Sequence, residues 1–183
     1  MPQEVTLRIR PAQPADAPAL AHVHVACWRT TYCGILPERF LAEQSLAHRL
    51  QQWKRHLADP QRATCDLVAE DTSGCIVAFA SAGLQLGGHP GYRGELFTLY
   101  VLRPYQRQGV GRRLMRQVCG HLLQRHIRSM LVCALKDNPS RAFYESLGGK
   151  LLGEQPLFLG ETAVPEVAYG WKDLAVLARR LKV

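Results

Sequence analysis

The clearest hydrophobic pattern in the chain runs from residue 95 to residue 102, where apolar side chains occupy both alternating sets of positions. A strand with two apolar faces is typical of the interior of a sheet. Pro104 ends this strand, because proline has no N–H to donate to a neighbouring strand. Gly109 and Gly111 follow, and from residue 110 onward apolar residues recur every four positions. The pattern predicts an interior strand, a turn, a glycine loop and a helix.

The rest of the chain predicts further strands and helices in alternation. Strands are predicted around residues 5–9, at 63–70, 75–86 and 129–135 and in the tail after 151, and helices at 17–29, around 46–57, at 110–126 and at 139–147. Turn residues join the strands 63–70 and 75–86, which predicts a hairpin. At 183 residues the chain suits one domain. The order β-α-α-β-β-β-α-β-α-β-β predicts an α/β domain with a mixed sheet.

The start of the helix at residue 110 is a candidate anion site. Unpaired N–H groups and the positive end of the helix dipole meet there. The glycines on either side of Val110 let main-chain amides turn toward a common point, and Arg107, Arg112 and Arg113 add positive charge. Neither a P-loop nor a dinucleotide fingerprint is present. We therefore expect a phosphate-binding corner of another kind.

Composition narrows the class of protein. The chain is 47% hydrophobic and 21% charged, which is typical of a globular fold. Its net charge of +8 favours anionic partners, but the basic residues are spread out rather than clustered. A cofactor with several phosphates accounts for the charge as well as nucleic acid does, and we expect no nucleic-acid partner.

The six cysteines indicate a reduced protein without a metal site. They show neither a C-x-x-C motif nor the His spacing of zinc sites, and several lie within apolar patterns. No apolar run approaches the roughly 18 residues that a membrane helix needs, and no signal peptide is evident. We expect a cytoplasmic protein with no metal and no membrane partner, and a homodimer remains open.

Two ordered motifs resemble those of a known family. Gln106-Arg107-Gln108-Gly109-Val110-Gly111 follows the strand Leu99-Tyr100-Val101 and is similar to the coenzyme A signature Gln/Arg-x-x-Gly-x-Gly/Ala of the GNAT superfamily of N-acetyltransferases. The block from Asn138 to Gly148 resembles the next motif of that family. The resemblance is strongest over residues 63–149. It implies a GNAT-type α/β fold, with a mixed, mostly antiparallel central sheet flanked by helices, whose fourth and fifth strands splay apart around the pantetheine arm.

The resemblance also implies acetyl-CoA as co-substrate and suggests which residues bind it. These are Leu99, Tyr100, Val101, Arg107, Gln108, Gly109, Val110, Gly111, Arg112 and Asn138. The Val101 N–H is the expected donor to the thioester oxygen, because preorganised main-chain amides serve that role well. Asn138 can also cap the following helix, with Pro139 at its first position.

Glu95 and Tyr144 are the candidate catalytic residues. An alkyl amine has a pKa of about 10.4 and must lose a proton before it attacks, so a carboxylate acting directly or through water would help. Glu95, at the entry to the interior strand, is the candidate base, although a solvated glutamate is an equal alternative. Tyr144 lies about 100° round the helix from its apolar stripe and is the candidate acid for the leaving thiolate. Its alternative is a packed tyrosine with a satisfied hydroxyl.

The acceptor amine is the open question. The family places its acceptor wall in the region of Trp28 and Tyr32, although an aromatic staple between two helices explains these residues equally well. The acidic residues form no cluster of the kind that would suit polyamines, so a small-molecule amine is favoured. The alternatives are acetylation of protein N-termini or lysines, and a non-catalytic acyl-CoA-binding regulatory module.

Covalent catalysis through Cys133 or Cys119 is the less favoured mechanism, because neither has an activating histidine nearby in sequence.

Overall fold

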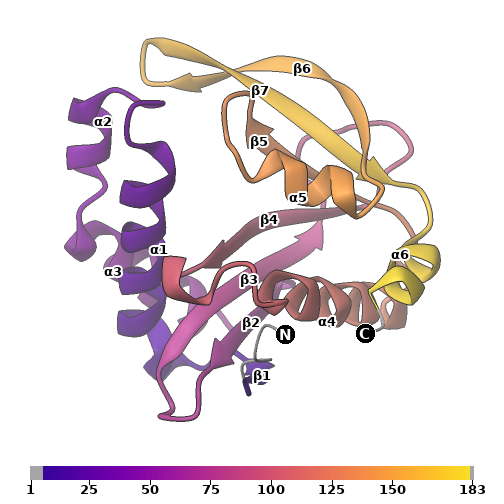
Figure 1. Ribbon diagram of the computed structural model, residues 1–183, viewed down its shortest axis with the longest axis horizontal. Helices are drawn as coiled ribbons and strands as arrows, with labels where there is room; N and C mark the ends of the chain where they lie inside the picture. Colours follow the sequence, from indigo (N-terminus) through magenta and orange to yellow (C-terminus); the bar gives the residue numbers. More distant parts are fainter. Residues whose placement is uncertain (1–5, 182–183) are drawn as a thin grey trace.

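The computed structural model describes residues 6–181 and contains one seven-stranded sheet with helices on both faces (Figure 1). The strands are β1 (Arg8–Pro11), β2 (Cys65–Glu70), β3 (Ile76–Leu84), β4 (Gly94–Val101), β5 (Met130–Leu135), β6 (Lys150–Leu159) and β7 (Thr162–Trp171). The helices are α1 (Ala17–Tyr32), α2 (Glu38–Glu43), α3 (Leu46–Ala58), α4 (Val110–Gln124), α5 (Arg141–Ser146) and α6 (Leu174–Arg180), with single turns at Pro14–Asp16 and Arg103–Tyr105.

The sheet confirms the predicted fold class. Its strand order is β1-β2-β3-β4-β5-β7-β6, and every neighbouring pair is antiparallel except β4 and β5, which are parallel. The apolar strand at residues 94–101 therefore lies inside the sheet, as its two apolar faces predict. The 65–70 and 76–84 strands form the predicted hairpin. Only the first three residues of each strand pair, Gly94–Leu96 of β4 with Met130–Val132 of β5. Beyond these residues the two strands separate.

Two apolar layers hold the helices against the sheet. On one face α4 and α6 cover β2 to β7, and Leu114, Val118 and Leu122 of α4 are fully buried there. These are residues of the four-residue repeat that predicts this helix. On the other face α1 and α3 pack through Leu20, Val23, Trp53 and neighbouring side chains onto β2 and β3. Figure 1 shows α1, α2 and α3 together on one side of the sheet, opposite α4.

A third apolar cluster joins the α1–α2 connection to the β6–β7 hairpin. Tyr32, Leu36 and Leu135 are buried at its centre, with Trp28 and Phe40 packed beside them. In Figure 1 the hairpin extends from the sheet toward α2. This contact encloses the side of the molecule on which β4 and β5 diverge.

Some element boundaries differ from those predicted. The first strand begins at Arg8, later than the alternation of Leu7 and Ile9 suggests, and Val5 lies outside the described residues. α1 extends three residues beyond Arg29. The helix predicted from Pro139 begins only at Arg141, and its N-cap position is Ser140.

Candidate active site

The divergence of β4 from β5 leaves main-chain groups of β4 without a partner strand. The Leu102 N–H donates to the Val77 carbonyl at 2.9 Å, which sets the phase of the β3–β4 ladder. Main-chain groups in an antiparallel ladder alternate in direction. Those of Tyr100 therefore face β3, whereas those of Leu99 and Val101 face the gap toward β5. The sequence prediction of three cofactor-facing main-chain residues is thus narrowed to two, and Tyr100 contributes its side chain.

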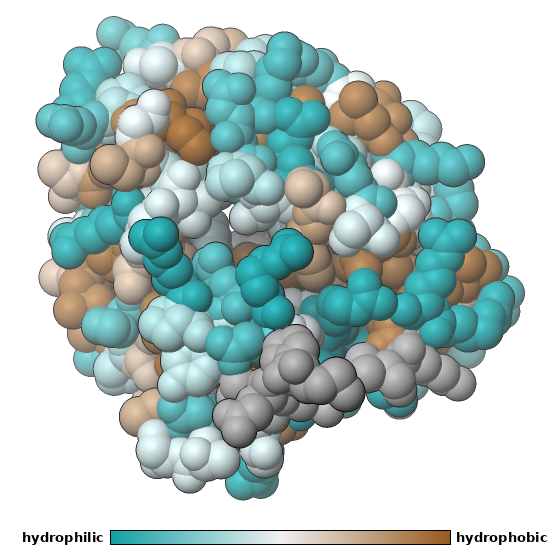
Figure 2. Space-filling model, in the orientation of Figure 1, coloured by the Kyte–Doolittle hydropathy of each residue, from teal (hydrophilic) through white to brown (hydrophobic). Residues whose placement is uncertain are grey.

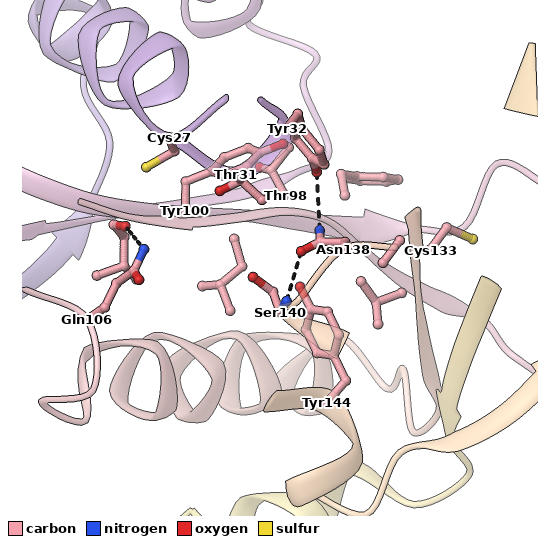
Figure 3. Close-up of a pocket in the computed structure, with 15 residues that line it drawn as sticks. Cys27, Thr31, Tyr32, Thr98, Tyr100, Gln106, Cys133, Asn138, Ser140 and Tyr144 are labelled. Carbon is pink, nitrogen blue, oxygen red and sulfur yellow. Dashed lines mark hydrogen bonds between the residues drawn. The ribbon is translucent and has the colours of Figure 1, made fainter. Parts of the chain in front are cut away.

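A narrow cavity of about 70 Å³ lies in this gap (Figure 3), and we call it the slot. Its lining residues are Cys27, Thr31 and Tyr32 of α1, residues 97–101 of β4, Gln106, residues 132–134 of β5, and Asn138, Ser140 and Tyr144. Figure 2, in the orientation of Figure 1, shows a hollow near the centre of this face, over the gap between β4 and α5 and rimmed by hydrophilic side chains.

Tyr144 closes the slot from the α5 side. Its side chain is 7% exposed, and its ring packs between those of Phe143, Tyr169 and Trp171. The hydroxyl end points toward Asn138 and Ser140 (Figure 3), and among the described residues it has no hydrogen-bond partner. Burial raises the pKa of this phenol above its usual value of 10. A packed tyrosine whose hydroxyl is already satisfied, the alternative from the sequence, is not what the structure contains.

A chain of hydrogen bonds crosses the slot on the α1 side. The Asn138 side-chain nitrogen donates to the Tyr32 hydroxyl at 3.3 Å, and Trp28 Nε1 donates to the Tyr100 hydroxyl at 2.8 Å. The Asn138 side-chain oxygen accepts from the Ser140 N–H at 2.8 Å. Asn138 thus stabilises the turn before α5 instead of capping a helix at Pro139, which explains the later helix start.

Trp28 and Tyr32 differ in their contacts. Tyr32 lines the slot, whereas Trp28 packs against Tyr32 and Phe40 with ring centroids 5.0 and 6.0 Å apart. The Trp28 contacts are those of an aromatic staple between α1 and α2. A role for either residue in acceptor binding stays a prediction.

The glycine loop leads from the mouth of the slot to the start of α4. Gly109 is the N-cap residue with a φ of 78°, a left-handed conformation that favours glycine, and no side chain caps the helix. A side chain added at Gly109 would meet nothing within 4 Å, so this surface is open. The Gln106 side chain donates to the Val101 carbonyl at 2.9 Å and joins the loop to β4. The amides of the first turn of α4, from Val110 to Arg112, have no partner within the helix.

Gly111 has a different role from Gly109. A side chain at Gly111 would lie 3.3 Å from the Phe143 ring, so this glycine lets α4 approach α5 closely. The Arg112 side chain donates to the Arg180 carbonyl at 2.8 Å, and Arg113 donates to the Leu7 carbonyl. Both guanidinium groups therefore contact the protein's own main chain. The Arg112 main-chain N–H still belongs to the first turn of α4.

Glu95 lies on β4 at the point where β4 and β5 still pair. Its side chain is half-buried, and Oε2 accepts from the Leu86 N–H at 3.3 Å. Burial raises the pKa of this carboxyl, and the nearby Glu166 raises it further, while the Leu86 N–H and His89 act in the opposite direction. Glu95 does not line the slot itself.

A second cavity, of about 590 Å³, lies on the α1–α3 side of the sheet, and we call it the large cavity. Its lining residues are His24, Gln52, Trp53, His56, Ala63, Thr64, Ser81, Leu84, Leu86, Phe97 and Thr98. Phe97 and Thr98 also line the slot. These two residues reach both cavities because β4 has a bulge at this point. Ser81 pairs with Thr98 while the next residue, Ala82, pairs with Leu96, which leaves Phe97 unpaired.

The two cysteines of the slot, and Cys119 in the core face of α4, are neutral thiols. Burial raises the pKa of Cys27, Cys119 and Cys133 to about 12. The Cys133 sulfur points away from Tyr144 (Figure 3), and the Cys27 thiol lies against the Val101 N–H. A thiol that stays protonated is a poor nucleophile. This supports the sequence argument against covalent catalysis.

Comparison with known proteins identifies the family. The family model described as "Acetyltransferase (GNAT) family" matches residues 22–149. The chain belongs to the GNAT family. As a GNAT protein it is an acyltransferase that uses acetyl-CoA as co-substrate. The N-acetyltransferase YuaI of Bacillus subtilis, itself uncharacterized, is 34% identical over 92% of this chain and 95% of its own length.

Solved structures share the GNAT fold. The PaiA N-acetyltransferase of Thermoplasma acidophilum, in complex with coenzyme A, is 19% identical and covers 88% of this chain and 98% of its own, with a TM-score of 0.67. yncA of Salmonella typhimurium, with its cofactor acetyl-CoA, is 20% identical and covers 92% of this chain and 94% of its own, with a TM-score of 0.64. The slot and the uncapped start of α4 suit such a ligand, because a diphosphate needs free N–H donors and a pantetheine arm needs an extended gap.

Several lining residues were not predicted from the sequence. Cys27, Gln106 and Ser140 line the slot, and the bulge that presents Phe97 and Thr98 has no sequence signature. One feature of the sequence could have pointed to His24, because it is a polar residue within the buried stripe of α1.

Within residues 6–181 no cluster of His, Cys, Asp and Glu could hold a metal ion, and no helix there is long and apolar enough to span a membrane.

Proposed function

We propose that this GNAT protein transfers the acetyl group of acetyl-CoA to a primary amine of a small molecule, by direct attack of the amine in a ternary complex. The proposal rests above all on Tyr144, a buried side chain at the closed side of the slot whose hydroxyl has no protein partner among the described residues. A binding module would need the gap and the glycine loop, but it would have no use for an unpartnered proton donor in that position.

Binding of the co-substrate would use main-chain groups. The amides at the start of α4, at Val110, Gly111 and Arg112, would hold the diphosphate, and the Gly109 main chain would turn toward it. Leu99 and Val101 would offer their gap-facing groups to the pantetheine arm. Arg107, Gln108 and Asn138 remain candidate contacts by resemblance to the family.

The proton transfers would fall to two side chains. Glu95 would accept a proton from the acceptor amine, directly or through water, and its raised pKa brings it closer to the neutral range in which a base works well. Tyr144 would donate its proton to the departing thiolate, because its own raised pKa keeps the hydroxyl protonated at neutral pH. The Val101 N–H would donate to the thioester oxygen. Its present contact, the Cys27 thiol, is a weak acceptor that the oxygen can replace.

The experiment is a screen of amines with acetyl-CoA, read out as released thiol and as an acetylated product by mass spectrometry. We expect turnover that requires both the amine and the protein. A protein that binds acetyl-CoA but releases no thiol with any small amine, peptide N-terminus or lysine peptide would be a binding module instead. Turnover with peptides alone would favour the protein-acetyltransferase alternative.

A further inference from the structure

The large cavity has the size and wall composition of a small-molecule site. Its volume of about 590 Å³ lies within the range of ligand pockets, roughly 300–1,000 Å³. Trp53, Leu84, Leu86 and Phe97 form an apolar wall, and the polar residues that also line the cavity expose little polar surface to it. Such a wall favours an apolar or aromatic body.

The large cavity meets the slot at one point. The bulge at Phe97 lets both Phe97 and Thr98 line the two hollows. Glu95 lies at the edge of the same region, because its carboxylate accepts from the main-chain N–H of the cavity residue Leu86. A molecule bound in the cavity therefore has the bulged strand on one side and the candidate base beside it.

Two buried polar atoms in the cavity wall have no partner. His24 Nδ1 and Thr98 Oγ1 make no hydrogen bond among the described residues, although both atoms are shielded from solvent. His24 as a whole is only 6% exposed. Leaving a buried polar atom unsatisfied destabilises a fold, and because solvent does not reach either atom, a ligand would bond them only after their side chains turn toward the cavity.

The charges of the cavity wall limit what that ligand can carry. Asp66, which bonds three residues of the wall from beneath, is already satisfied, because it accepts from Ser81 at 2.6 Å and Thr64 at 2.7 Å and pairs with His56 at 2.9 Å. None of the lining residues is acidic. His24 is uncharged, because burial lowers its pKa to about 3. The wall therefore offers nothing to a second cationic group.

We propose that the large cavity is the acceptor site and that it takes a primary monoamine on an apolar, ring-sized body. This inference rests on the proposed acetyl transfer and names the acceptor class for it. Polyamines are disfavoured because the wall has no carboxylate to bind a second ammonium group.

The first test compares acceptors of different classes on the wild-type protein. Steady-state kinetics would use 2-phenylethylamine, spermidine and phenylalanine with saturating acetyl-CoA. We expect kcat/KM for 2-phenylethylamine to exceed that for either of the others by at least about tenfold, because only this amine combines an aromatic body with a single charge. Spermidine or phenylalanine acetylated as well as 2-phenylethylamine would overturn the inference.

The second test fills the cavity from its rim. Ala63 is exposed where it borders the cavity, so Ala63→Trp adds bulk there without replacing a core residue. We expect a KM for 2-phenylethylamine at least about tenfold higher, with an unchanged dissociation constant for acetyl-CoA by calorimetry. Ala47→Trp, at an exposed position of α3 outside the cavity wall, is the matched control and should change neither value. If Ala63→Trp unfolds, Leu86→Trp at a residue 86% exposed replaces it.

The two proposals fail in different ways. Turnover of an amine by wild-type protein with the same KM in Ala63→Trp would overturn the cavity assignment and leave acetyl transfer intact. No thiol release from wild-type protein with any amine would overturn the proposed function itself. A raised KM in Ala63→Trp, with the control unchanged, supports both.

Discussion

The slot and the large cavity share Phe97 and Thr98, but main-chain groups determine the character of the slot and side chains determine that of the large cavity. The slot is narrow, about 70 Å³, and its character comes from the unpaired main chain of β4 and the open start of α4. The large cavity is about 590 Å³, and side chains of α1, α3 and the β2–β3 hairpin line it. Main-chain groups are the same whatever the residue. The half of the site that suits a common co-substrate is thus insensitive to sequence, and the half that would choose an acceptor depends on it.

Tyr144→Phe should have the largest effect, and it acts on the slot alone. The change removes one hydroxyl and keeps the packed ring, so we expect kcat to fall about 100- to 1,000-fold, the lower part of the usual range for a lost general acid. Affinity for acetyl-CoA by calorimetry should stay within about twofold. Loss of affinity without loss of kcat would assign Tyr144 to binding instead.

Tyr169→Phe is the matched control for that change. Tyr169 is a buried neighbour whose ring lies 6.3 Å from that of Tyr144, but its hydroxyl accepts from Arg141 and donates to Glu145, away from the slot. The Tyr169→Phe variant should lose some stability and keep the kcat of the wild-type protein.

Gly109→Glu should disrupt binding of acetyl-CoA by the main-chain groups at the start of α4. Nothing in the protein lies within 4 Å of an added side chain there, so the new carboxylate would occupy the space expected for the diphosphate and repel it. We expect the affinity for acetyl-CoA to fall about 100-fold, or about 2.8 kcal/mol. Gly109→Asn is the control, because asparagine tolerates the left-handed conformation without adding charge. Equal affinities of Gly109→Glu and wild type would contradict the phosphate corner.

Glu95→Gln tests the junction of the two hollows. A base works only when deprotonated, so wild-type activity should be lost as the pH falls through the raised pKa of Glu95. In Glu95→Gln the rate at neutral pH should fall about tenfold and recover toward high pH, where the amine loses its proton unaided. An unaltered pH–rate profile would make solvent the proton acceptor.

Glu95→Gln should lower the reaction rate without lowering the stability of the fold. A carboxyl whose pKa is raised by folding binds its proton more tightly in the folded state, so stability declines as the pH rises through that window. Glu95→Gln should therefore unfold at an equal or higher temperature than wild type at pH 7. A lower melting temperature would mean that lost structure contributes to the loss of rate.

His56→Gln should give the smallest effect, at the floor of the large cavity. Asp66 raises the pKa of His56 through their hydrogen bond. This pair therefore stabilises the fold fully below about pH 6.5, the unfolded value, and its contribution is lost as the pH rises through the folded pKa. The His56 side chain is 34% exposed, so solvent limits the effect to roughly 0.5 kcal/mol. Urea unfolding of His56→Gln should show a larger loss of stability at pH 5.5 than at pH 9, and His22→Gln, at an exposed position of α1, is the matched control for removing a histidine.

Local patterns in the sequence predicted most of the fold. The apolar strand from residue 95, the glycine loop and the four-residue repeat of α4 were predicted correctly, because periodicity and glycine placement act over a few residues. The boundaries near Asn138 were wrong, because its side chain bonds the Ser140 N–H and reaches Tyr32, a residue that is distant in sequence. The structure separates the contacts of Trp28 and Tyr32, since only Tyr32 lines the slot, and their role as an acceptor wall stays a prediction.

The sequence by itself determined the family, the co-substrate and the order of the elements, since these depend on short motifs and on hydrophobic periodicity. Only the tertiary structure decided that Phe97 is an extra residue opposite Ser81 and Ala82, and that His24, Thr98 and Trp53 line one cavity. The physical reason is that a bulge and a cavity arise from the register and packing of segments far apart in the chain. No local pattern of residues encodes either of them.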